Sequence, residues 1–332
     1  MYNDRQIPVW QPGEYSYPRA FGFEPNLMPY LHGDGTVRPC MIVCPGGGYT
    51  HVSPAEGELP AKKFYDKGFN CFVFTYTTDI LSAEPLLEQP SRDLARAVRF
   101  VRANSDRFEI DPERVCLCGF SAAAHVCASV CDYFAEITDA NPLYGAVSCR
   151  PDAAILSYPV ITSGRHAHQG SFRTLLGRDI YERTDAEAAA LLDRWSLEKH
   201  VSPDTPPCFI WQTASDASVP VENSYLYAEA LKEKGILFAH HVFSHGRHGM
   251  SVADSEWGAG KIGEPYCLEQ IVRTIEAMNA GLISVSEEDR KDLIAQAPEN
   301  RVPKKDGADP EVMVWPDLAY AFLRYAGIIP SE

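Results

Sequence analysis

The chain has 332 residues, of which 45% are hydrophobic and 23% charged, a composition typical of a globular protein with one sizeable core. Its 30 Lys and Arg residues against 45 Asp and Glu residues give a formal net charge of −15 at pH 7, which argues against binding to nucleic acids and to anionic membranes. No stretch approaches the ~18 apolar residues that a membrane span needs, so we expect no membrane partner either.

The N-terminal residues and the cysteines indicate a reducing compartment. The first residues, MYNDRQIPVW, lack the basic flank and the apolar run of a signal peptide. The ten cysteines include no CxxC pair, and most lie in apolar segments, where cysteine behaves as a small buried residue. Reduced thiols of this kind are typical of the cytoplasm, so we expect a cytoplasmic protein.

Along the chain, an irregular beginning gives way to alternating strands and helices. Residues 1–35 are rich in Pro, Tyr and Gly, so we expect an N-terminal arm there, wrapped around one domain over 36–332. The apolar segment 37–44 predicts a strand that ends in a PGGG turn, and Ser53 and Glu56 have the spacing of a capping box that starts a helix reaching residue 67. An irregular stretch is expected from about 160 to 200. Further strands are expected over 69–76, 110–120, 153–160, 208–215 and 236–243, and further helices over 91–106, 121–134, 221–235 and 316–327.

This alternation predicts an α/β fold. Strands joined by helices need crossover connections, which give a mostly parallel central sheet with helices on both faces. In such sheets, ligand chemistry lies beyond the carboxyl ends of the strands. Functional residues are therefore expected just after Cys44, Cys118, Ser215 and Phe243.

The segment GFSAA, residues 119–123, has the pattern of a nucleophile elbow. Small residues on both sides allow a tight turn between strand and helix, which lifts the serine hydroxyl above the sheet edge beside the positive end of the helix. Ser121 is therefore the candidate nucleophile, the alternative being that it only caps an ordinary helix. Ala123 stands where the pattern usually has glycine.

A serine nucleophile needs a base and an acid that orients the base, and in this topology they follow the serine in the order acid, then histidine. Asp216 comes directly after the strand 208–215, and His248 follows the next strand, so both lie at strand ends in the required order. His245 is the competing base because it lies on the same loop. The glycines near His248 favour it, since they free the backbone to turn the imidazole towards Ser121.

Acyl transfer also needs hydrogen-bond donors for the oxyanion. The glycine turn 46–48 can supply backbone amides without side chains in the way, although it could also be only a flexible turn. Together with the amide after the nucleophile, it would form an oxyanion hole of Gly47, Gly48 and Ala122. The turn lacks GxGxxG spacing and a phosphate-loop lysine, so we expect no nucleotide and no other cofactor.

Other residues could bind substrate or be structural. Glu56 and Glu58 could touch a sugar, but helix capping and solvation also explain them. His125 is expected to be a packed, hydrogen-bonded residue of the elbow helix. No metal is expected, because the histidines of the 160–200 loop lack metal-ligand spacing. The aromatic residues that could stack on a sugar or fill the core are Tyr158, Trp195 and Trp211.

Five segments together resemble the acetyl-xylan-esterase-like, carbohydrate-esterase branch of the α/β hydrolases. They are CPGGGY (44–49), SPAEGE (53–58), GFSAAAH (119–125), TPPCFIWQTASDASVPVENS (205–224) and HGRHGMSVA (245–253). The resemblance implies an α/β-hydrolase fold with Ser121 as nucleophile, Asp216 as orienting acid and His248 as base. The chain departs from this branch at Ala123 and Ala124, where glycines are usual.

The segment from about 254 to 312 is expected as a helical insertion before the last helix, because relatives have a shorter link there. Its helical segments, 265–283 and 286–296, could form a lid, a contact in a homodimer, or a peripheral addition. In particular, residues 262–300 are expected as a flap over the mouth of the site, since the segment begins just past His248.

These features predict a serine esterase that hydrolyses short-chain esters, acetyl above all, on a carbohydrate. The expected partner is thus a small-molecule or oligosaccharide ester, and the methyl groups of Ala123 and Ala124 suggest a small acyl pocket. Two alternatives are another serine hydrolase, such as a peptidase or a phenolic or xenobiotic ester hydrolase, and a non-catalytic binding module on the same fold.

Overall fold

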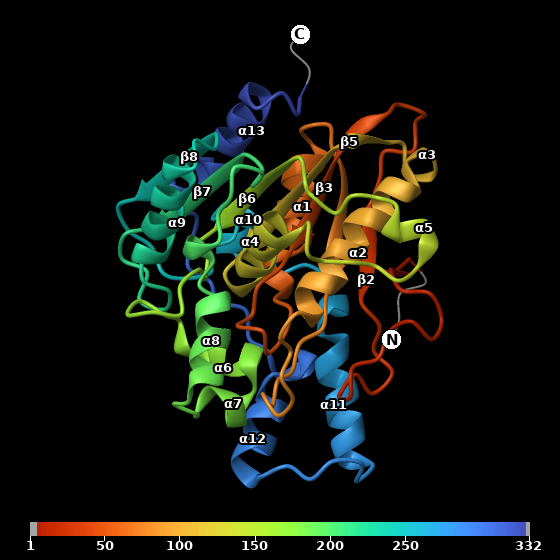
Figure 1. Cartoon of the computed structure of the whole chain (residues 1–332), viewed down its shortest axis with the longest axis vertical. Coiled ribbons are helices and arrows are strands. Elements are labelled where there is room, and N and C mark those ends of the chain that lie inside the picture. Colours follow the sequence, from red (N-terminus) through yellow and green to blue (C-terminus); the bar gives the residue numbers. More distant parts are fainter. Residues whose placement is uncertain (1–4, 330–332) are drawn as a thin grey trace.

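The computed structural model describes residues 5–329 (Figure 1). Residues 1–4 of the expected arm and 330–332 of the expected domain lie outside the described residues. At the centre is an eight-stranded sheet with the strand order β1-β2-β4-β3-β5-β6-β7-β8. The strands are β1 (Ile7–Pro8), β2 (Asn26–Tyr30), β3 (Arg38–Cys44), β4 (Asn70–Thr75), β5 (Ile110–Phe120), β6 (Ala153–Ser157), β7 (Cys208–Thr213) and β8 (Phe238–Phe243).

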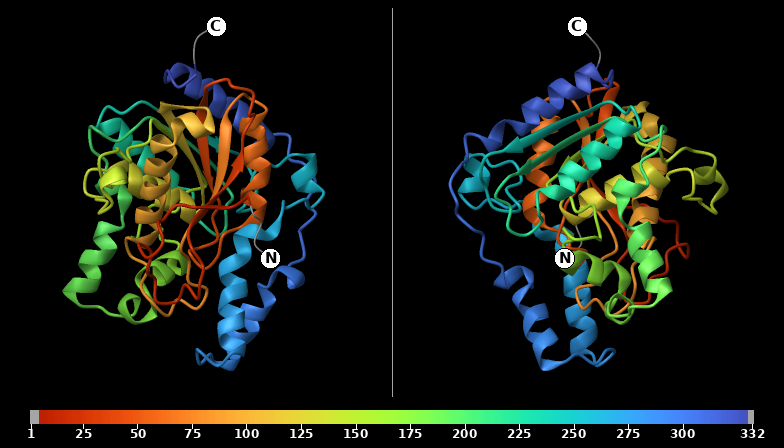
Figure 2. Two further views of the ribbon diagram at one scale, coloured as in Figure 1. Left: turned by 90° about the vertical axis from the view of Figure 1, so that its right-hand side faces the viewer. Right: turned by 60° about the vertical axis from the view of Figure 1, so that its left-hand side comes forward.

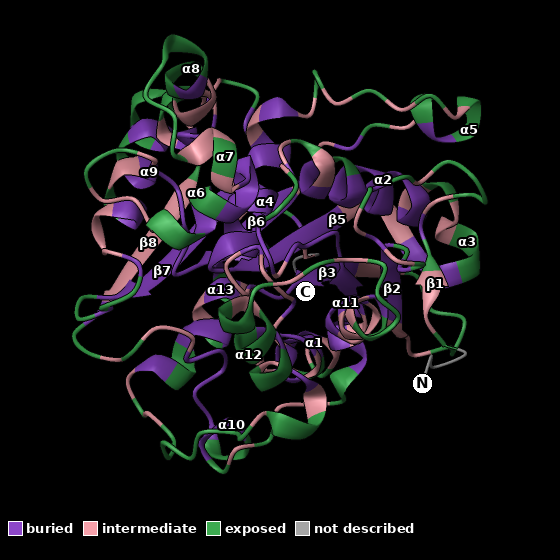
Figure 3. Cartoon of the chain, turned by 90° about the horizontal axis from the view of Figure 1, so that it is seen from below, coloured by how far each residue is buried: buried purple, intermediate pink, exposed green. Residues whose placement is uncertain are grey.

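The sheet is mostly parallel, which confirms the predicted fold class. Strands β3 to β8 all pair in parallel, whereas β2 pairs antiparallel with β4 and with β1. Every residue of β4, β6 and β7 is buried, as expected for apolar strands covered on both faces. Figure 3 shows the buried sheet at the centre, with exposed residues on the outer helices and on the loops.

Helices cover both faces of this sheet. Helices α1 and α13 lie on one face, and α2, α4 and α9 lie on the other (Figure 2). The helices are α1 (Glu58–Tyr65), α2 (Gln89–Ala103), α3 (Ser105–Phe108), α4 (Ala122–Tyr133), α5 (Pro142–Gly145), α6 (Gln169–Leu176), α7 (Arg178–Tyr181), α8 (Ala186–Arg194), α9 (Glu222–Glu233), α10 (Ser255–Gly258), α11 (Glu269–Asn279), α12 (Glu287–Ala295) and α13 (Trp315–Tyr325).

Two segments that were expected to be irregular contain strands or helices. The expected arm contributes β2, a strand of the central sheet, whose sequence NLMPY has an internal proline and no alternation of polar and apolar residues. The stretch between 160 and 200 holds α6, α7 and α8. The start of α8 could have been predicted from the sequence, because Asp185 is a residue typical of an N-cap. Its carboxylate accepts hydrogen bonds from the amides of Glu187 and Ala188.

The predicted capping box is wrong. Residues Pro54–Glu56 form a short 3₁₀ turn, α1 begins only at Glu58, and the side chain of Ser53 makes no capping hydrogen bond. Glu56 instead turns into the protein, where only 5% of its surface is exposed. Glu56 therefore does not cap a helix, and its carboxyl group can form hydrogen bonds inside the protein.

The segment 254–312 packs beside the sheet domain and extends from it. Helices α11 and α12 lie side by side at one end of the molecule (Figures 1 and 2). Leu268, Ile271 and Leu293 form a small apolar cluster of their own. The side chain of Gln270 anchors this pair of helices to the sheet domain, because it bonds the amide, hydroxyl and carbonyl of Thr78.

The state of the cysteines and the lengths of the helices were both predicted from the sequence. All ten cysteines are buried and free, in agreement with the prediction of structural thiols. Over residues 5–329, no helix is both long and apolar enough to cross a membrane.

Candidate active site

Ser121 occupies a sharp turn between β5 and α4. Its backbone has φ 53° and ψ −120°, a conformation that is strained for a residue with a side chain and typical of a nucleophile elbow. Gly119 makes the turn possible, since a Cβ there would lie 2.7 Å from the carbonyl oxygen of Ala123 and from the Cα of Ala124. The elbow therefore needs glycine before the serine but accommodates alanine after it.

Ala123 and Ala124 are not among the residues that line the cleft. Both residues are fully buried in the hydrophobic core. The expectation that these methyl groups narrow an acyl pocket is thus wrong, because they pack inside α4 and β5 rather than towards the site.

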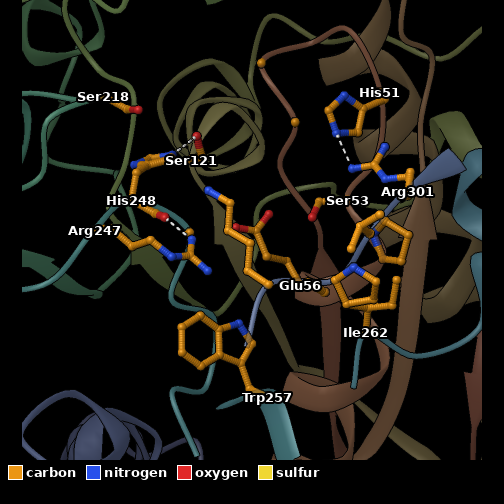
Figure 4. Close-up of a pocket in the computed structure, with 18 of the residues that line it drawn as sticks. His51, Ser53, Glu56, Ser121, Ser218, Arg247, His248, Trp257, Ile262 and Arg301 are labelled. Atoms are coloured by element: carbon orange, nitrogen blue, oxygen red, sulfur yellow. Dashed lines mark hydrogen bonds between the residues drawn. The ribbon is translucent and has the colours of Figure 1, made fainter. Parts of the chain in front are cut away.

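Three side chains from three strand ends form one hydrogen-bonded row. The Nε2 atom of His248 lies 2.7 Å from the hydroxyl oxygen of Ser121, and its Nδ1 atom lies 2.6 Å from Oδ2 of Asp216 (Figure 4). An ionised carboxylate only accepts hydrogen bonds, so Nδ1 carries the proton and Nε2 is left to accept from the serine hydroxyl. In this arrangement the imidazole can act as a base towards Ser121.

Asp216 is held in its charged form. Burial opposes its ionisation, but the hydrogen bonds from His248 and from the amides of Val219 and Ser218 outweigh burial and lower the pKa of the carboxyl. The carboxylate thus remains available to orient the imidazole.

A second buried carboxyl, Glu56, connects the glycine turn to the imidazole. It accepts hydrogen bonds from the amide of Gly46 at 2.9 Å and from the hydroxyl of Tyr158 at 2.6 Å. The ring of Tyr158 in turn packs edge-on against His248, with ring centroids 4.9 Å apart. Burial raises the pKa of Glu56. Capping and solvation therefore do not explain this residue, because it lies inside the site.

The glycine turn faces the same cleft as Ser121. Gly47 and Gly48 have φ values of 133° and 64°, and Gly46 approaches the elbow so closely that a Cβ would lie 2.4 Å from the carbonyl oxygen of Phe120. Within residues 5–329, the amides of Gly47, Gly48 and Ala122 donate to no acceptor. These amides are free to bind an oxyanion.

The cleft above Ser121 has a volume of about 470 Å³. Part of its wall comes from the segment 254–312, which contributes Trp257, Ile262 and residues 301–304. Among the described residues that line the cleft, Ile262 belongs to the expected flap 262–300, whereas none belongs to α11 or α12. The lining also includes His168, one of the histidines of the 160–200 loop that lack metal-ligand spacing.

The remaining candidates lie elsewhere. His245 is largely exposed, with its ring nitrogens 3.1 Å from Asp309 and 3.0 Å from Glu311. His125 is fully buried between the hydroxyl of Tyr49 and the carbonyl of Trp195, as expected for a packed histidine. The aromatic side chains that could have stacked on a sugar, Tyr158, Trp195 and Trp211, are all core residues. No group of three metal-ligating side chains occurs in residues 5–329.

Comparison with known proteins gives a consistent result. Residues 30–231 match the BD-FAE family, a match that includes Ser121 and Asp216 and ends before His248. The chain is similar to endo-1,4-beta-xylanase B of Butyrivibrio fibrisolvens, with 52% identity over 265 residues, and to an acetylxylan esterase of Xylanibacter ruminicola, with 30% identity over 213 residues. These matches cover 80% and 63% of this chain but only 41% and 40% of the relatives.

A solved structure matches over nearly its whole length. The acetyl ester-xyloside bifunctional hydrolase from Caldicellulosiruptor lactoaceticus has a TM-score of 0.68 and 36% identity, over 84% of this chain and 97% of that chain. The carboxylesterase Cest-2923 from Lactobacillus plantarum, at 23% identity and a TM-score of 0.64, shares the fold.

Proposed function

Because the chain belongs to the BD-FAE family of α/β hydrolases, we propose that it is a serine esterase that removes short acyl groups, acetyl above all, from a carbohydrate. The observation that carries the proposal is the hydrogen-bonded row of Ser121, His248 and Asp216 beside three free amides. The substrate class is supported by the relatives, whose names refer to xylan, to acetylxylan and to an acetyl ester-xyloside.

The reaction begins when the Ser121 hydroxyl attacks the ester carbonyl and passes its proton to Nε2 of His248. Asp216 stabilises the imidazolium that forms, and the amides of Gly47, Gly48 and Ala122 bind the oxyanion. The imidazolium then protonates the departing sugar hydroxyl, which leaves an acyl group on Ser121. Water, deprotonated by His248, attacks this acyl-enzyme and releases the carboxylic acid and the free serine.

We expect a preference for short acyl chains. This expectation follows from the relatives, whose names refer to acetylxylan and to an acetyl ester-xyloside. The values of kcat/KM for nitrophenyl acetate and propionate should exceed that for the octanoate by on the order of tenfold or more.

Acetylated xylo-oligosaccharides, a peptide anilide and an aryl ester of a phenolic acid, assayed in parallel, test the substrate class. Release of acetate from the oligosaccharides is the expected result. Preference for the octanoate, for the peptide or for the phenolic ester would contradict the proposal. A chain that neither turns over any ester nor reacts with a fluorophosphonate would be a binding module.

Glu56 is expected to position the site without touching the reacting atoms. Glu56→Gln removes the carboxylate that accepts hydrogen bonds from the Gly46 amide and the Tyr158 hydroxyl. The oxyanion turn and the Tyr158 ring that packs against His248 should therefore both become less well ordered. We expect kcat for nitrophenyl acetate to fall about tenfold, with little change in KM.

The matched control is Glu58→Gln. Its carboxylate lies two residues away but bonds Lys62 and the amide of Glu264, so this change should leave kcat unaltered. Equal kcat values for wild type and Glu56→Gln would mean that the buried carboxyl has no part in positioning.

A further inference from the structure

The cleft is positively charged in a protein that is strongly acidic overall. Among the residues that line it, Arg247, Arg301 and Lys304 are cationic and Glu56 is the one carboxyl, whereas the whole chain has a formal net charge of −15. Arg301 and Lys304 both come from the segment 301–304, which forms part of the cleft wall. The local charge is thus a property of this wall and not of the protein surface in general.

The three cations differ in whether a carboxylate balances them. Nε and Nη2 of Arg247 lie 2.7 and 2.5 Å from Oδ2 of Asp306, so its charge is compensated. In the described part of the chain, the hydrogen-bond partners of Arg301 are two neutral groups, the amide oxygen of Gln296 at 3.0 Å and Nε2 of His51 at 3.2 Å. Over residues 5–329, neither Arg301 nor Lys304 forms an ion pair.

Arg301 is held in place by neutral partners. Thr50 donates its hydroxyl proton to the carbonyl of Gly47 at 2.8 Å, so it accepts from Nδ1–H of His51, and Nε2 of His51 is left to accept from Arg301. Burial lowers the pKa of His51 to about 3, and the neighbouring charge of Arg301 acts in the same direction, so the imidazole is neutral. The guanidinium therefore keeps its full charge beside the cleft, fixed in orientation and without a counter-ion.

Arg301 and His51 lie across the cleft from Ser121 and His248 (Figure 4). Glu56 forms no ion pair with Arg301 among the described residues; its two oxygens accept hydrogen bonds from the Gly46 amide and the Tyr158 hydroxyl. A substrate that reaches Ser121 with its ester thus has room to place a negative group against the opposite wall. Burial lowers the pKa of Arg301, a cost that a bound carboxylate would offset.

We propose that Arg301 and Lys304 form an anion subsite for a carboxylate on the ester substrate, as in an acetylated oligosaccharide that carries a uronic acid. This inference rests on the proposed esterase function and narrows its substrate. The carboxylate could belong to the sugar or to the acyl group, and the two sources are separated by substrate pairs.

The experiment compares kcat/KM for two pairs of esters with the full chain. One pair is an acetylated xylo-oligosaccharide with and without a uronic-acid substituent, and the other is nitrophenyl hemisuccinate and nitrophenyl butyrate. Wild type should prefer the charged member of at least one pair by about tenfold at low ionic strength. The preference should shrink at 0.5 M salt, because the subsite is open to solvent. The pair that shows it identifies the side of the ester that bears the carboxylate.

Four variants locate the preference. Arg301→Gln and Lys304→Gln should each bring the charged-to-neutral ratio towards one, mainly through a higher KM for the charged ester. Arg301→Lys, which retains the charge but not the fork of donors, should keep part of the ratio. Lys305→Gln, an exposed cation next in sequence that does not line the cleft, should leave the ratio unchanged.

The possible failures are distinguishable. A wild-type enzyme that hydrolyses nitrophenyl acetate but shows no preference in either pair would overturn the anion subsite alone. Equal losses on charged and neutral esters in both Gln variants would also overturn it, since they would point to a structural role through His51. Absence of hydrolysis of every ester, nitrophenyl acetate included, would instead overturn the proposed function.

Discussion

Ser121→Ala is expected to remove nearly all ester hydrolysis, by about four to six orders of magnitude in kcat. The reason is that the hydroxyl forms the bond to the acyl carbon, and no other hydroxyl lies within hydrogen-bond distance of His248 in the described part of the chain. The amides of Gly47, Gly48 and Ala122 should sustain a small residual rate.

The same substitution should leave the fold intact. Alanine adopts the φ of 53° at this turn with the same strain as serine, and within residues 5–329 the one hydrogen bond of the lost hydroxyl is to His248. We expect the melting temperature to stay within about 2–4 °C of wild type, which corresponds to ~1 kcal/mol for a domain of this size.

Ser218→Ala is the matched control for this prediction. Ser218 lines the same cleft, and it is the backbone amide of this residue, not the hydroxyl, that bonds Asp216. This variant should keep its activity within severalfold and should still react with a fluorophosphonate, whereas Ser121→Ala should not. If Ser121→Ala retains a tenth of wild-type activity, the nucleophile lies elsewhere.

Most of the sheet could be predicted because its strands are buried on both faces. Such strands are continuous apolar runs between turn residues, as in 69–76 and 208–215, and helix α2 between two of them has a clear amphipathic period. Strand β2 could not be predicted in this way, since five residues with an internal proline give no period. Its pairing with β4 depends on contacts with residues about 45 positions away along the chain.

The triad candidates could be identified from the sequence because the carboxyl ends of parallel strands lie at one edge of the sheet. Ser121 and His248 are 127 residues apart, yet both follow strands whose carboxyl ends lie at one edge of the sheet. The choice between His248 and His245 rested on nearby glycines, and the structure turns the two rings to different surroundings.

Glu56 and Arg301, which support the site, could not be identified from the sequence in this way. Glu56 lies 102 residues from Tyr158, and Arg301 lies 250 residues from His51. A local pattern assigned Glu56 to a helix cap. The assignment failed because long-range contacts decide where the Glu56 side chain lies, and such contacts leave no trace in spacing or periodicity.

His248→Ala should be as damaging as the loss of the serine, whereas His245→Ala should be nearly silent. In the first variant, Ser121 loses the only base in hydrogen-bond contact with it among the described residues, and Asp216 keeps its charge without an imidazole to orient. We expect kcat/KM for nitrophenyl acetate to fall by about four orders of magnitude or more. His245 is 63% exposed and bonds Asp309 and Glu311, so its loss should cost at most ~1 kcal/mol of stability and less than about threefold in rate.

The pair of variants decides between the two histidines on one loop. Both lie on residues 245–248, so any general disturbance of the loop should affect them alike, and only a specific role in proton transfer separates them. Burst kinetics with nitrophenyl acetate give the sharper readout: wild type and His245→Ala should form the acyl-enzyme quickly, and His248→Ala should show no burst because Ser121 cannot lose its proton. If instead His245→Ala is inactive while His248→Ala retains the burst, the base is His245, and the loop must rearrange on substrate binding to bring that ring from Asp309 to Ser121.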